Sequence, residues 1–521
     1  MLQVARKKFR VFCLVCCYVA ILSAHGSILY VPNEYPTIQS ALNATTAGDS
    51  VIVAYGIYVE AVVTPNFNVF LIGVPVDDSS GVSLPIIDPS SLPNPQSLTC
   101  LHIQSSNTLI ENFELRNGPE MYPRMDPFEG GIRLGGNSVT LRNCTFDSTY
   151  TAIRSYEPVS PLTIEHCFFF DVNYSLLCPQ TEVHATDCYF LKKGFACAGN
   201  SVIAGCVFDS ISPGYALNTV GHVTVQSCIF KQHDAIGMPT IDAAFMSGVI
   251  SGNTFLECRP STGIVVTTRN CDAELYIENN RFENIDPYAQ SGRAISWGCE
   301  DGTHGGQVIF RGNVFINCSS DLGGKCFFGF DSTALEVTQN YFINNPGNNS
   351  TISSTSRNGV YRRNVFIENE YALNSTFSCD ARLNYWGDST GPYHPTLNPD
   401  GLGDRVSDSV LFDSWYSDTS FLINATDERA NLPTQFALFV YPNPFNSTAR
   451  ISLEVSDPFI ASINLVNILS QHVREIHRGP VNGREEFTIN ADNLPSGIYF
   501  LTVRDVIKNA VKSAQKIALI R

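Results

Sequence analysis

The sequence has few cationic residues for its length. Its 521 residues include 33 Lys and Arg against 49 Asp and Glu, which gives a formal net charge of −16. A chain this acidic is poorly suited to bind the phosphates of a nucleic acid or an anionic membrane surface. We therefore expect no nucleic-acid partner.

Long hydrophobic runs are also scarce. One run, residues 11–22, follows the cationic stretch 6–10 and is too short to span a bilayer. With the small residues Ala24 and Gly26 behind it, it is typical of a signal peptide over residues 1–26. We expect an exported protein with no transmembrane segment in the mature chain.

Beyond that segment the sequence lacks cysteine pairs at metal-binding spacing. No CxxC pair occurs in the mature chain although the sequence has 17 Cys, which argues against a zinc finger. Export would favour disulfides. Five of the Cys, however, recur at one position of the repeat described next, where buried free thiols are the better interpretation. One or two disulfides between neighbouring coils stay open as an alternative.

An eight-residue phrase recurs through most of the chain. It reads VIFRGNVF at residues 308–315, and further copies end at Phe146, Phe169, Phe190, Phe208, Phe230, Phe255, Phe282, Phe342 and Phe366. Aligned on the closing Phe, the copies lie about 18 to 33 residues apart, a period typical of repeat architectures.

Within a phrase the apolar residues change faces. Val139 and Leu141 share one parity and Cys144 and Phe146 the other, so the chain must bend between Leu141 and Cys144. At this corner many copies place residues that tolerate a left-handed backbone: Asn112, Asn143, Asp187, Gly205, Gly252, Asn279 and Gly312. Other copies place His166, Ser227, Gln339 and Arg363 there. Each copy is predicted to be strand, corner, strand.

A column of small polar residues follows the corner. It comprises Cys144, Cys167, Cys188, Cys206 and Cys228, then Asn253, Asn280, Asn313, Asn340, Asn364 and Asn384. Stacked coils place equivalent residues about 4.8 Å apart, so the Asn amides can hydrogen-bond along the column. With a further apolar strand before many phrases, three short strands per turn predict an all-β fold, a parallel β-solenoid.

The stretch after the signal peptide predicts a cap for the solenoid. Pro36 suits the first turn of a helix, and Ile38, Ala41 and Leu42 recur at helical spacing. A short helix within residues 27–48 would cover the open end of the stack.

The same region, YVPNEYPTIQSALNA followed by GDSVIV and GIYVE, resembles the opening of pectate-lyase-like right-handed β-helix proteins. The resemblance extends to about Trp415 and implies a right-handed parallel β-helix over residues 49–417. It implies no single activity, because this superfamily includes lyases, hydrolases, epimerases and non-catalytic binding proteins.

The repeat ends in a turn-rich segment that begins NYWGD at residue 384 and continues GPYHP. It resembles the terminal segment of exported β-helix proteins. Its carboxylates are candidate Ca²⁺ ligands: Asp388, Asp400, Asp404 and Asp408. The alternative is a closing loop in which Asp side chains serve the backbone.

After a polar connector, residues 418–434, alternating strands over residues 435–521 predict a small β-sandwich. Its motifs YPNPFN, LPSGIYFL and the closing KIALIR resemble the C-terminal sorting domain of proteins exported by the type IX secretion system. The resemblance implies that this domain engages the type IX machinery. It also implies passage to the surface of a Gram-negative bacterium or into the medium. The alternative is an ordinary Ig-like domain.

Two groups of residues are candidates for a site. Elimination in an acidic polysaccharide needs a cation and a Lys or Arg base, and glycoside hydrolysis needs two carboxylates. Suitable residues recur in the turns of successive coils: Arg269, Asp272, Glu300, Asp301, His304 and Asp331. The alternative is that they are solvated turn residues.

The second group is the outward pair Arg133 and Arg154 with Glu157, beside the long insertion 118–129. An Arg column can hold sugar carboxylates or sulfates bidentately. Gly221-His222 is similar to a polygalacturonase element, but the accompanying Asp pair and Arg-x-Lys are missing nearby. No catalytic residue is therefore carried over from the family.

Three functions follow as hypotheses. The first is an exported protein that binds polysaccharide or acts as a surface adhesin. The second is a polysaccharide lyase or glycoside hydrolase with its site on the solenoid turns. The third is a structural spacer without a ligand. The sequence establishes no cofactor, and Ca²⁺ is the one candidate.

Overall fold

The computed structural model forms two compact units, one within residues 22–423 and one within 424–521. It describes residues 26–421 and 436–519, without these gaps: 79–80, 94–98, 118–129, 179, 236–237, 261–263, 268–273, 286–292, 298–306, 319–324, 330–333, 346–349, 357–358, 420, 442–444, 468–471, 493 and 506–509. The predicted signal peptide therefore lies almost wholly outside the described residues. No helix in the described part of the chain is long and apolar enough to cross a membrane.

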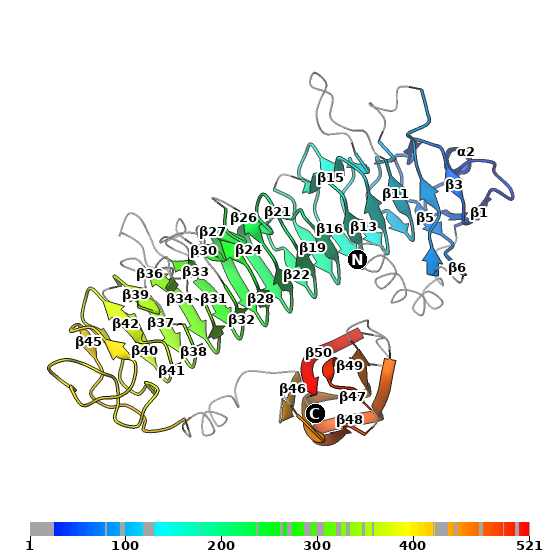
Figure 1. Ribbon diagram of the computed structural model, residues 1–521. Coiled ribbons are helices and arrows are strands. Elements are labelled where there is room, and N and C mark those ends of the chain that lie inside the picture. Colours follow the sequence, from blue (N-terminus) through cyan, green and yellow to red (C-terminus); the bar gives the residue numbers. More distant parts are fainter. Residues whose placement is uncertain are drawn as a thin grey trace. The chain divides into compact units, whose positions relative to one another are not determined.

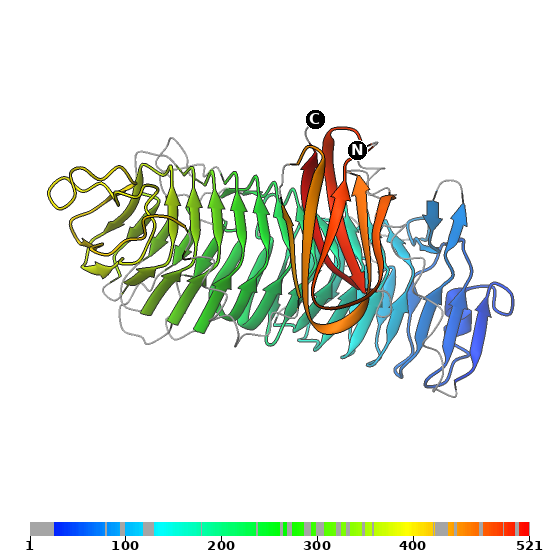
Figure 2. The ribbon, with the colours of Figure 1, turned by 90° about the horizontal axis from the view of Figure 1, so that it is seen from below.

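The larger unit is a stack of coils built from three series of parallel strands (Figures 1 and 2). The first series comprises β4 (Val62–Val63), β9 (Leu101–Ile103), β12 (Ile132–Leu134), β15 (Thr151–Ser155), β18 (Tyr174–Leu177), β21 (Phe195–Ala198), β30 (Val265–Thr267), β33 (Arg293–Trp297), β36 (Lys325–Gly329), β39 (Ile352–Ser354), β42 (Tyr371–Ser375) and β44 (Arg405–Val406). The second series comprises β1 (Ile28–Val31), β2 (Ser50–Val53), β5 (Phe70–Gly73), β10 (Leu109–Glu111), β13 (Val139–Arg142), β16 (Leu162–Glu165), β19 (Val183–Thr186), β22 (Val202–Ala204), β31 (Glu274–Glu278), β34 (Gln307–Arg311), β37 (Ala334–Thr338), β40 (Gly359–Arg362), β43 (Cys379–Asp380) and β45 (Val410–Leu411).

Two long strands, β24 (Leu217–Gln226) and β27 (Ile241–Ser251), pair with both series and join them into one 28-stranded sheet. The third series forms a separate 13-stranded sheet. It comprises β3 (Ile57–Tyr58), β8 (Ile86–Ile87), β11 (Glu114–Arg116), β14 (Thr145–Asp147), β17 (Phe168–Phe170), β20 (Tyr189–Leu191), β23 (Val207–Asp209), β25 (Ile229–Lys231), β28 (Thr254–Leu256), β32 (Arg281–Glu283), β35 (Val314–Ile316), β38 (Tyr341–Ile343) and β41 (Val365–Ile367). Two short pairs, β6 (Val76–Asp78) with β7 (Gly81–Ser83) and β26 (Asp234–Ala235) with β29 (Arg259–Pro260), lie outside the main sheets.

The corner between the second and third series is left-handed in every copy of the phrase. The predicted residues adopt positive φ, from 51° at Asp187 to 67° at Gly312. The residue types that do not favour this conformation adopt it as well, with φ of 54° at His166, 55° at Ser227, 58° at Gln339 and 57° at Arg363. The strand–corner–strand prediction is confirmed. The position in the coil determines the left-handed backbone conformation, and the residue type determines only the free-energy cost of adopting it.

The closing Phe of each phrase points inward and stacks on its neighbours. Consecutive rings from Phe146 to Phe366 lie 4.6–5.0 Å apart between centroids and within 12° of parallel. Trp386 ends the stack at 4.8 Å from Phe366. These spacings follow from the strand spacing of a sheet, about 4.8 Å.

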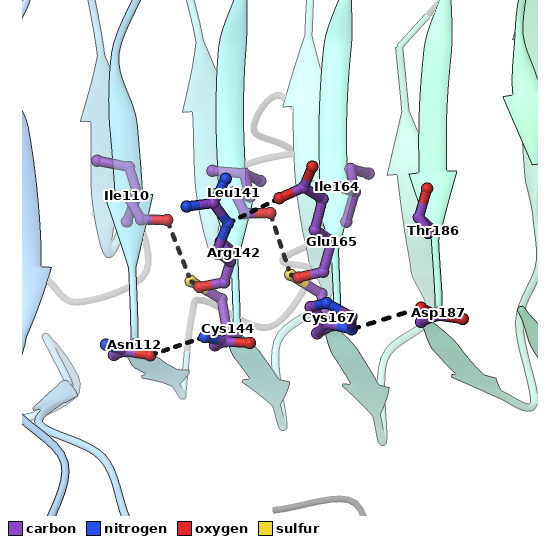
Figure 3. A network of polar contacts seen from close by, with 12 residues as sticks. Ile110, Asn112, Leu141, Arg142, Cys144, Ile164, Glu165, Cys167, Thr186 and Asp187 are labelled. Carbon is purple, nitrogen blue, oxygen red and sulfur yellow. Dashed lines mark hydrogen bonds and ion pairs between the residues drawn. The ribbon is translucent and has the colours of Figure 1, made fainter. Parts of the chain in front are cut away.

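The polar column is buried and hydrogen-bonded from end to end. In the Asn part, the amide of Asn313 donates to the Asn340 side chain at 3.0 Å and to the Ile277 carbonyl at 2.7 Å. In the Cys part, thiols donate to backbone carbonyls instead, as Figure 3 shows for Cys144 and Cys167. The five Cys of the column are free and buried. The preferred prediction, buried free thiols, fits this arrangement.

The N-terminal cap is a short helix, α2 (Ile38–Leu42), with Thr37 as N-cap. Ile38, Ala41 and Leu42 are buried in the core, as predicted. The carboxylate of Glu60 accepts the N–H groups of Ile38 and Gln39 at 2.9 Å and so completes the helix start. Strand β1, inside the segment predicted as cap, already pairs in parallel with β2.

The smaller unit is an antiparallel β-structure of five strands: β46 (Phe436–Tyr441), β47 (Thr448–Asn467), β48 (His472–Asn490), β49 (Gly497–Asp505) and β50 (Ala510–Leu519). The first half of β47 pairs with β46 and its second half with β49. Buried residues of both halves, such as Ile451 and Ile463, share one core. This is the predicted small sandwich.

Candidate functional site

Among the candidate residues, Arg133 and Arg154 lie within the described part of the chain and side by side. They are outward residues of neighbouring first-series strands, β12 and β15, and occupy directly opposed positions. The residues before them, Ile132 and Ile153, are fully buried, so the two guanidinium groups extend from the outer face. His102 continues the same row on β9, opposite Arg133.

Tyr156 holds the two arginines. The guanidinium carbon of Arg154 lies 3.8 Å from the centre of the Tyr156 ring, and that of Arg133 lies 5.0 Å away. Tyr156 is 40% exposed, so these cation–π contacts lie at the surface. We call Arg133, Arg154 and Tyr156 the arginine site.

The backbone next to the site is fixed by Ser155. Its hydroxyl is buried and donates to the carbonyl of Glu157, which closes the turn after β15. Glu157 itself is exposed. Because the Ser155 side chain is buried and hydrogen-bonded, the next residue, Tyr156, is directed to the outer face.

Two like charges directly opposite each other on adjacent strands destabilise a sheet. At two other positions on this solenoid the opposed charges have opposite signs: Arg142 bonds Glu165 at 2.7 Å (Figure 3) and Arg311 bonds Glu278 at 2.6 Å. A second cationic pair, Arg293 and Lys325, is opposed on β33 and β36. At the arginine site the facing residue is a second Arg. Two neighbouring guanidinium groups can together hold one anionic ligand.

His102 adds no further charge at neutral pH. Burial, and then the positive charge of Arg133, lower the pKa of His102. The neutral imidazole supplies a hydrogen-bonding group at the end of the row.

The six catalytic candidates Arg269, Asp272, Glu300, Asp301, His304 and Asp331 all lie outside the described residues. The strands before their turns are described, and β30, β33, β36 and β39 pair in parallel and in register. The strands that precede these residues therefore lie in successive coils, and the turn site itself stays a prediction.

The Ca²⁺ candidates lie in the closing segment, and Asp388, Asp404 and Asp408 have other partners. Asp404 is buried and accepts hydrogen bonds from the backbone N–H and side-chain amide of Asn369, while Asp388 bonds Thr390 two residues on. Asp408 lies 3.0 Å from the ring of His394. Within the described ranges no group of three or more His, Cys, Asp or Glu side chains is placed to hold a metal ion, so Asp388, Asp400, Asp404 and Asp408 do not converge there.

Sequence reasoning found the arginine pair but missed Tyr156 and His102. Tyr156 follows Arg154 by two residues and so shares its face, which was a usable signal. His102 precedes Arg133 across the irregular insertion 118–129, so the repeat did not reveal that the two are opposed.

Family comparisons cover both units. Residues 99–299 match the model for the right handed beta helix region, and residues 439–518 match the model for the secretion system C-terminal sorting domain. This chain is a right-handed parallel β-helix protein with a C-terminal type IX sorting domain. The sorting domain implies export, so the protein is secreted or held at the cell surface.

Similar solved structures include a mutant of the periplasmic alginate epimerase AlgG, at 11% identity over 74% of this chain and 82% of that one, with a TM-score of 0.22. They also include XylC in complex with xylose, at 9% identity over 89% of this chain and 99% of that one, with a TM-score of 0.19. Neither similarity is high enough to assign an activity or a ligand to this chain. No curated protein matches it.

Proposed function

We propose that this β-helix protein acts at the outer surface of a Gram-negative bacterium, or in the surrounding medium, and binds acidic polysaccharide through the arginine site. The observation that supports this function is the opposed pair Arg133 and Arg154, held over one tyrosine ring. A carboxylate or sulfate lowers the repulsion between the two guanidinium groups and accepts hydrogen bonds from both.

The geometry suits a repeating anionic polymer. Opposed residues on neighbouring strands lie about 5 Å apart, so both forks are within reach of one acidic group or of acidic groups on adjacent sugars. Tyr156 restricts the motion of both Arg side chains and lowers the entropy lost on binding. In this role Tyr156 positions the two arginines.

The test uses the full chain and polygalacturonate, by affinity electrophoresis at low and at physiological salt. We expect Arg133→Gln and Arg154→Gln each to weaken retention by about tenfold or more, because each removes charge-assisted hydrogen bonds of about 1.5–3 kcal/mol. Added salt should weaken wild-type retention.

Arg142→Gln is the matched control, because Arg142 is also an outward solenoid Arg but lies on the second strand series, where it bonds Glu165. It should retain polygalacturonate binding. Equal losses in all three variants, or no retention of the wild type, would contradict the proposed site.

A lyase or hydrolase on the solenoid turns is the second proposal, supported by the in-register strands β30, β33, β36 and β39. Prolonged incubation with polyuronates and neutral glycans should then yield unsaturated or reducing ends. If Glu300→Ala and Asp301→Ala left that activity unchanged, the turn site would be wrong. Retention without product would support the binding function alone.

A further inference from the structure

A second surface of the solenoid has the properties of a binding face. In the third strand series, from β14 to β41, the middle residue of each strand is the inward stacking Phe, so the flanking residues face outward. From β20 to β41 many of them are large and apolar, and we call this face the apolar strip: Leu191, Ile229, Leu256, Ile316, Ile343 and Ile367. Ile229 is 41% exposed, and the others are half-buried.

The charges on these strands cancel locally. Four charged residues lie on them, and they form two ion pairs, Lys231 with Asp209 and Arg281 with Glu283, both at 2.8 Å. The Tyr189 hydroxyl also donates to Asp209. The strip is therefore neutral, although the whole chain carries a formal charge of −16.

A row of exposed amides borders the strip. Asn284, Asn317 and Asn344 each follow a strip strand by one residue, and their side chains are linked by hydrogen bonds of 2.9 Å and 2.6 Å. Apolar contact area beside amide donors and acceptors is the combination that binds a sugar, which has C–H faces and a hydroxyl rim.

The shape of the strip decides between a polymer and a globular partner. Eight strands span it, so at about 4.8 Å per strand and about 3.3 Å per residue it is about 34 Å long and about 10 Å wide. Its area of about 340 Å² is well below the roughly 800 Å² per partner of a stable protein interface. A second copy of this chain would find too little surface, whereas one extended polymer chain fits the width.

A bound peptide strand is a poor occupant for the same face. Extended peptides bind sheets through the hydrogen-bonding groups of an edge strand. The strip is the face of the sheet, and its strands β23, β25, β28, β32, β35 and β38 each pair on both sides. Because the backbone groups of these strands are already paired, a ligand can contact only their side chains. Such contacts favour a polymer with a regular apolar face.

We propose that the apolar strip binds an uncharged polysaccharide chain lying along the solenoid axis. The sugar rings pack on the aliphatic side chains of successive coils, and the Asn row bonds their hydroxyls. This site is separate from the arginine site in both its strands and its ligand.

The test is affinity electrophoresis of the full chain in gels containing hydroxyethylcellulose, with polygalacturonate gels run in parallel. The double variant Ile316→Glu/Ile343→Glu should lose about tenfold or more of its hydroxyethylcellulose retention, because two buried charges oppose ring packing. Its polygalacturonate retention should be unchanged. Arg133→Gln should give the reverse pattern, so failure of one site is distinguishable from failure of the other.

The matched control is Ile309→Glu. Ile309 is an outward, half-buried residue of β34 in the same coil as Ile316, but on the second strand series. It should retain hydroxyethylcellulose binding, and thermal unfolding should show all variants folded. The proposal is overturned if the wild type is not retained by hydroxyethylcellulose. It is also overturned if Ile309→Glu loses as much as the double variant, or if sedimentation shows that the strip substitutions dissociate a dimer.

Discussion

Gln339 and Arg363 adopt φ of 58° and 57° at corners where other coils place Gly, Asn or Asp. A left-handed backbone costs an ordinary residue about 1–2 kcal/mol, and glycine avoids most of this cost. The neighbouring coils hydrogen-bond each corner on both sides, so the conformation persists despite the cost. At the residue scale, the feature that repeats from coil to coil is therefore the backbone conformation of the corner, more than the type of residue there.

This strain gives a direct prediction for Gln339. We expect Gln339→Gly to be more stable than Gln339→Ala by about 1 kcal/mol, because both remove the side chain but only glycine relieves the left-handed strain. The measurement is the urea midpoint of the full chain. An alanine variant as stable as the glycine variant would show that the corner is unstrained.

The Asn column supplies a second prediction. Asn313→Ala should lower the free energy of unfolding by about 2–4 kcal/mol, because it leaves buried groups on Ile277, Asn280 and Asn340 without partners. Asn374, an exposed residue of β42, is the control, and Asn374→Ala should change stability by less than about 0.5 kcal/mol. Equal effects of the two substitutions would contradict the role of the column.

Residues inside the repeat could be predicted from the sequence, because the stack repeats the same environment in every coil. Phe146 and Asn313 occupy such positions, and both were placed correctly. His102 is opposed to Arg133 across the irregular insertion 118–129, where the period is interrupted, so the sequence did not specify that register. Tyr156 lies two residues after Arg154, and that spacing indicates the shared face but not the contact between its ring and the guanidinium groups.

At the scale of elements, the closing segment ends the solenoid with hydrogen bonds. A second Asn row, Asn345 and Asn369, runs into Asp404, whose carboxylate accepts N–H groups from Asn369 and Glu370. Asp404 thus takes the place of the next Asn. The sequence indicated a carboxylate-rich loop, but spacing alone could not distinguish a metal ligand from a terminal acceptor.

Asp404 also makes a pH-dependent prediction. Burial raises the pKa of Asp404, so its ionisation disfavours the folded state above the ordinary carboxyl range. The stability of Asp404→Asn relative to wild type should be most favourable near pH 7. It should become less favourable as pH falls through the raised pKa, because wild-type Asp404 then becomes neutral too.

Thermal unfolding of both proteins between pH 7 and pH 4 measures this difference. Asp388→Asn is the control of opposite sign, since hydrogen bonds from the backbone and side chain of Thr390 lower the pKa of Asp388. The loss of stability that Asp388→Asn causes relative to the wild type should become smaller as pH falls. A pH-independent difference for Asp404→Asn would mean that Asp404 does not titrate as a buried carboxyl.

At the scale of the whole molecule, the two units have separate cores and separate tasks. The solenoid carries the candidate sites, and residues 439–518 carry the sorting signature. Deletion of residues 435–521 should leave a folded solenoid that stays inside the outer membrane. Immunoblots of cell fractions and medium would measure this, and continued appearance of the truncated protein in the medium would contradict the sorting function.

The exchange of Cys for Asn between Cys228 and Asn253 divides the solenoid into two parts of unequal cohesion. On the Asn side each coil is tied to the next by amide hydrogen bonds, whereas on the Cys side weak thiol donors perform that task. In a stack where each coil contacts only its neighbours, such a boundary allows one end to open while the other stays closed. We therefore expect the backbone amides of the first coils, on the Cys side, to exchange their hydrogens with solvent faster than those of the last coils. Local opening of the solenoid would then start at its N-terminal end.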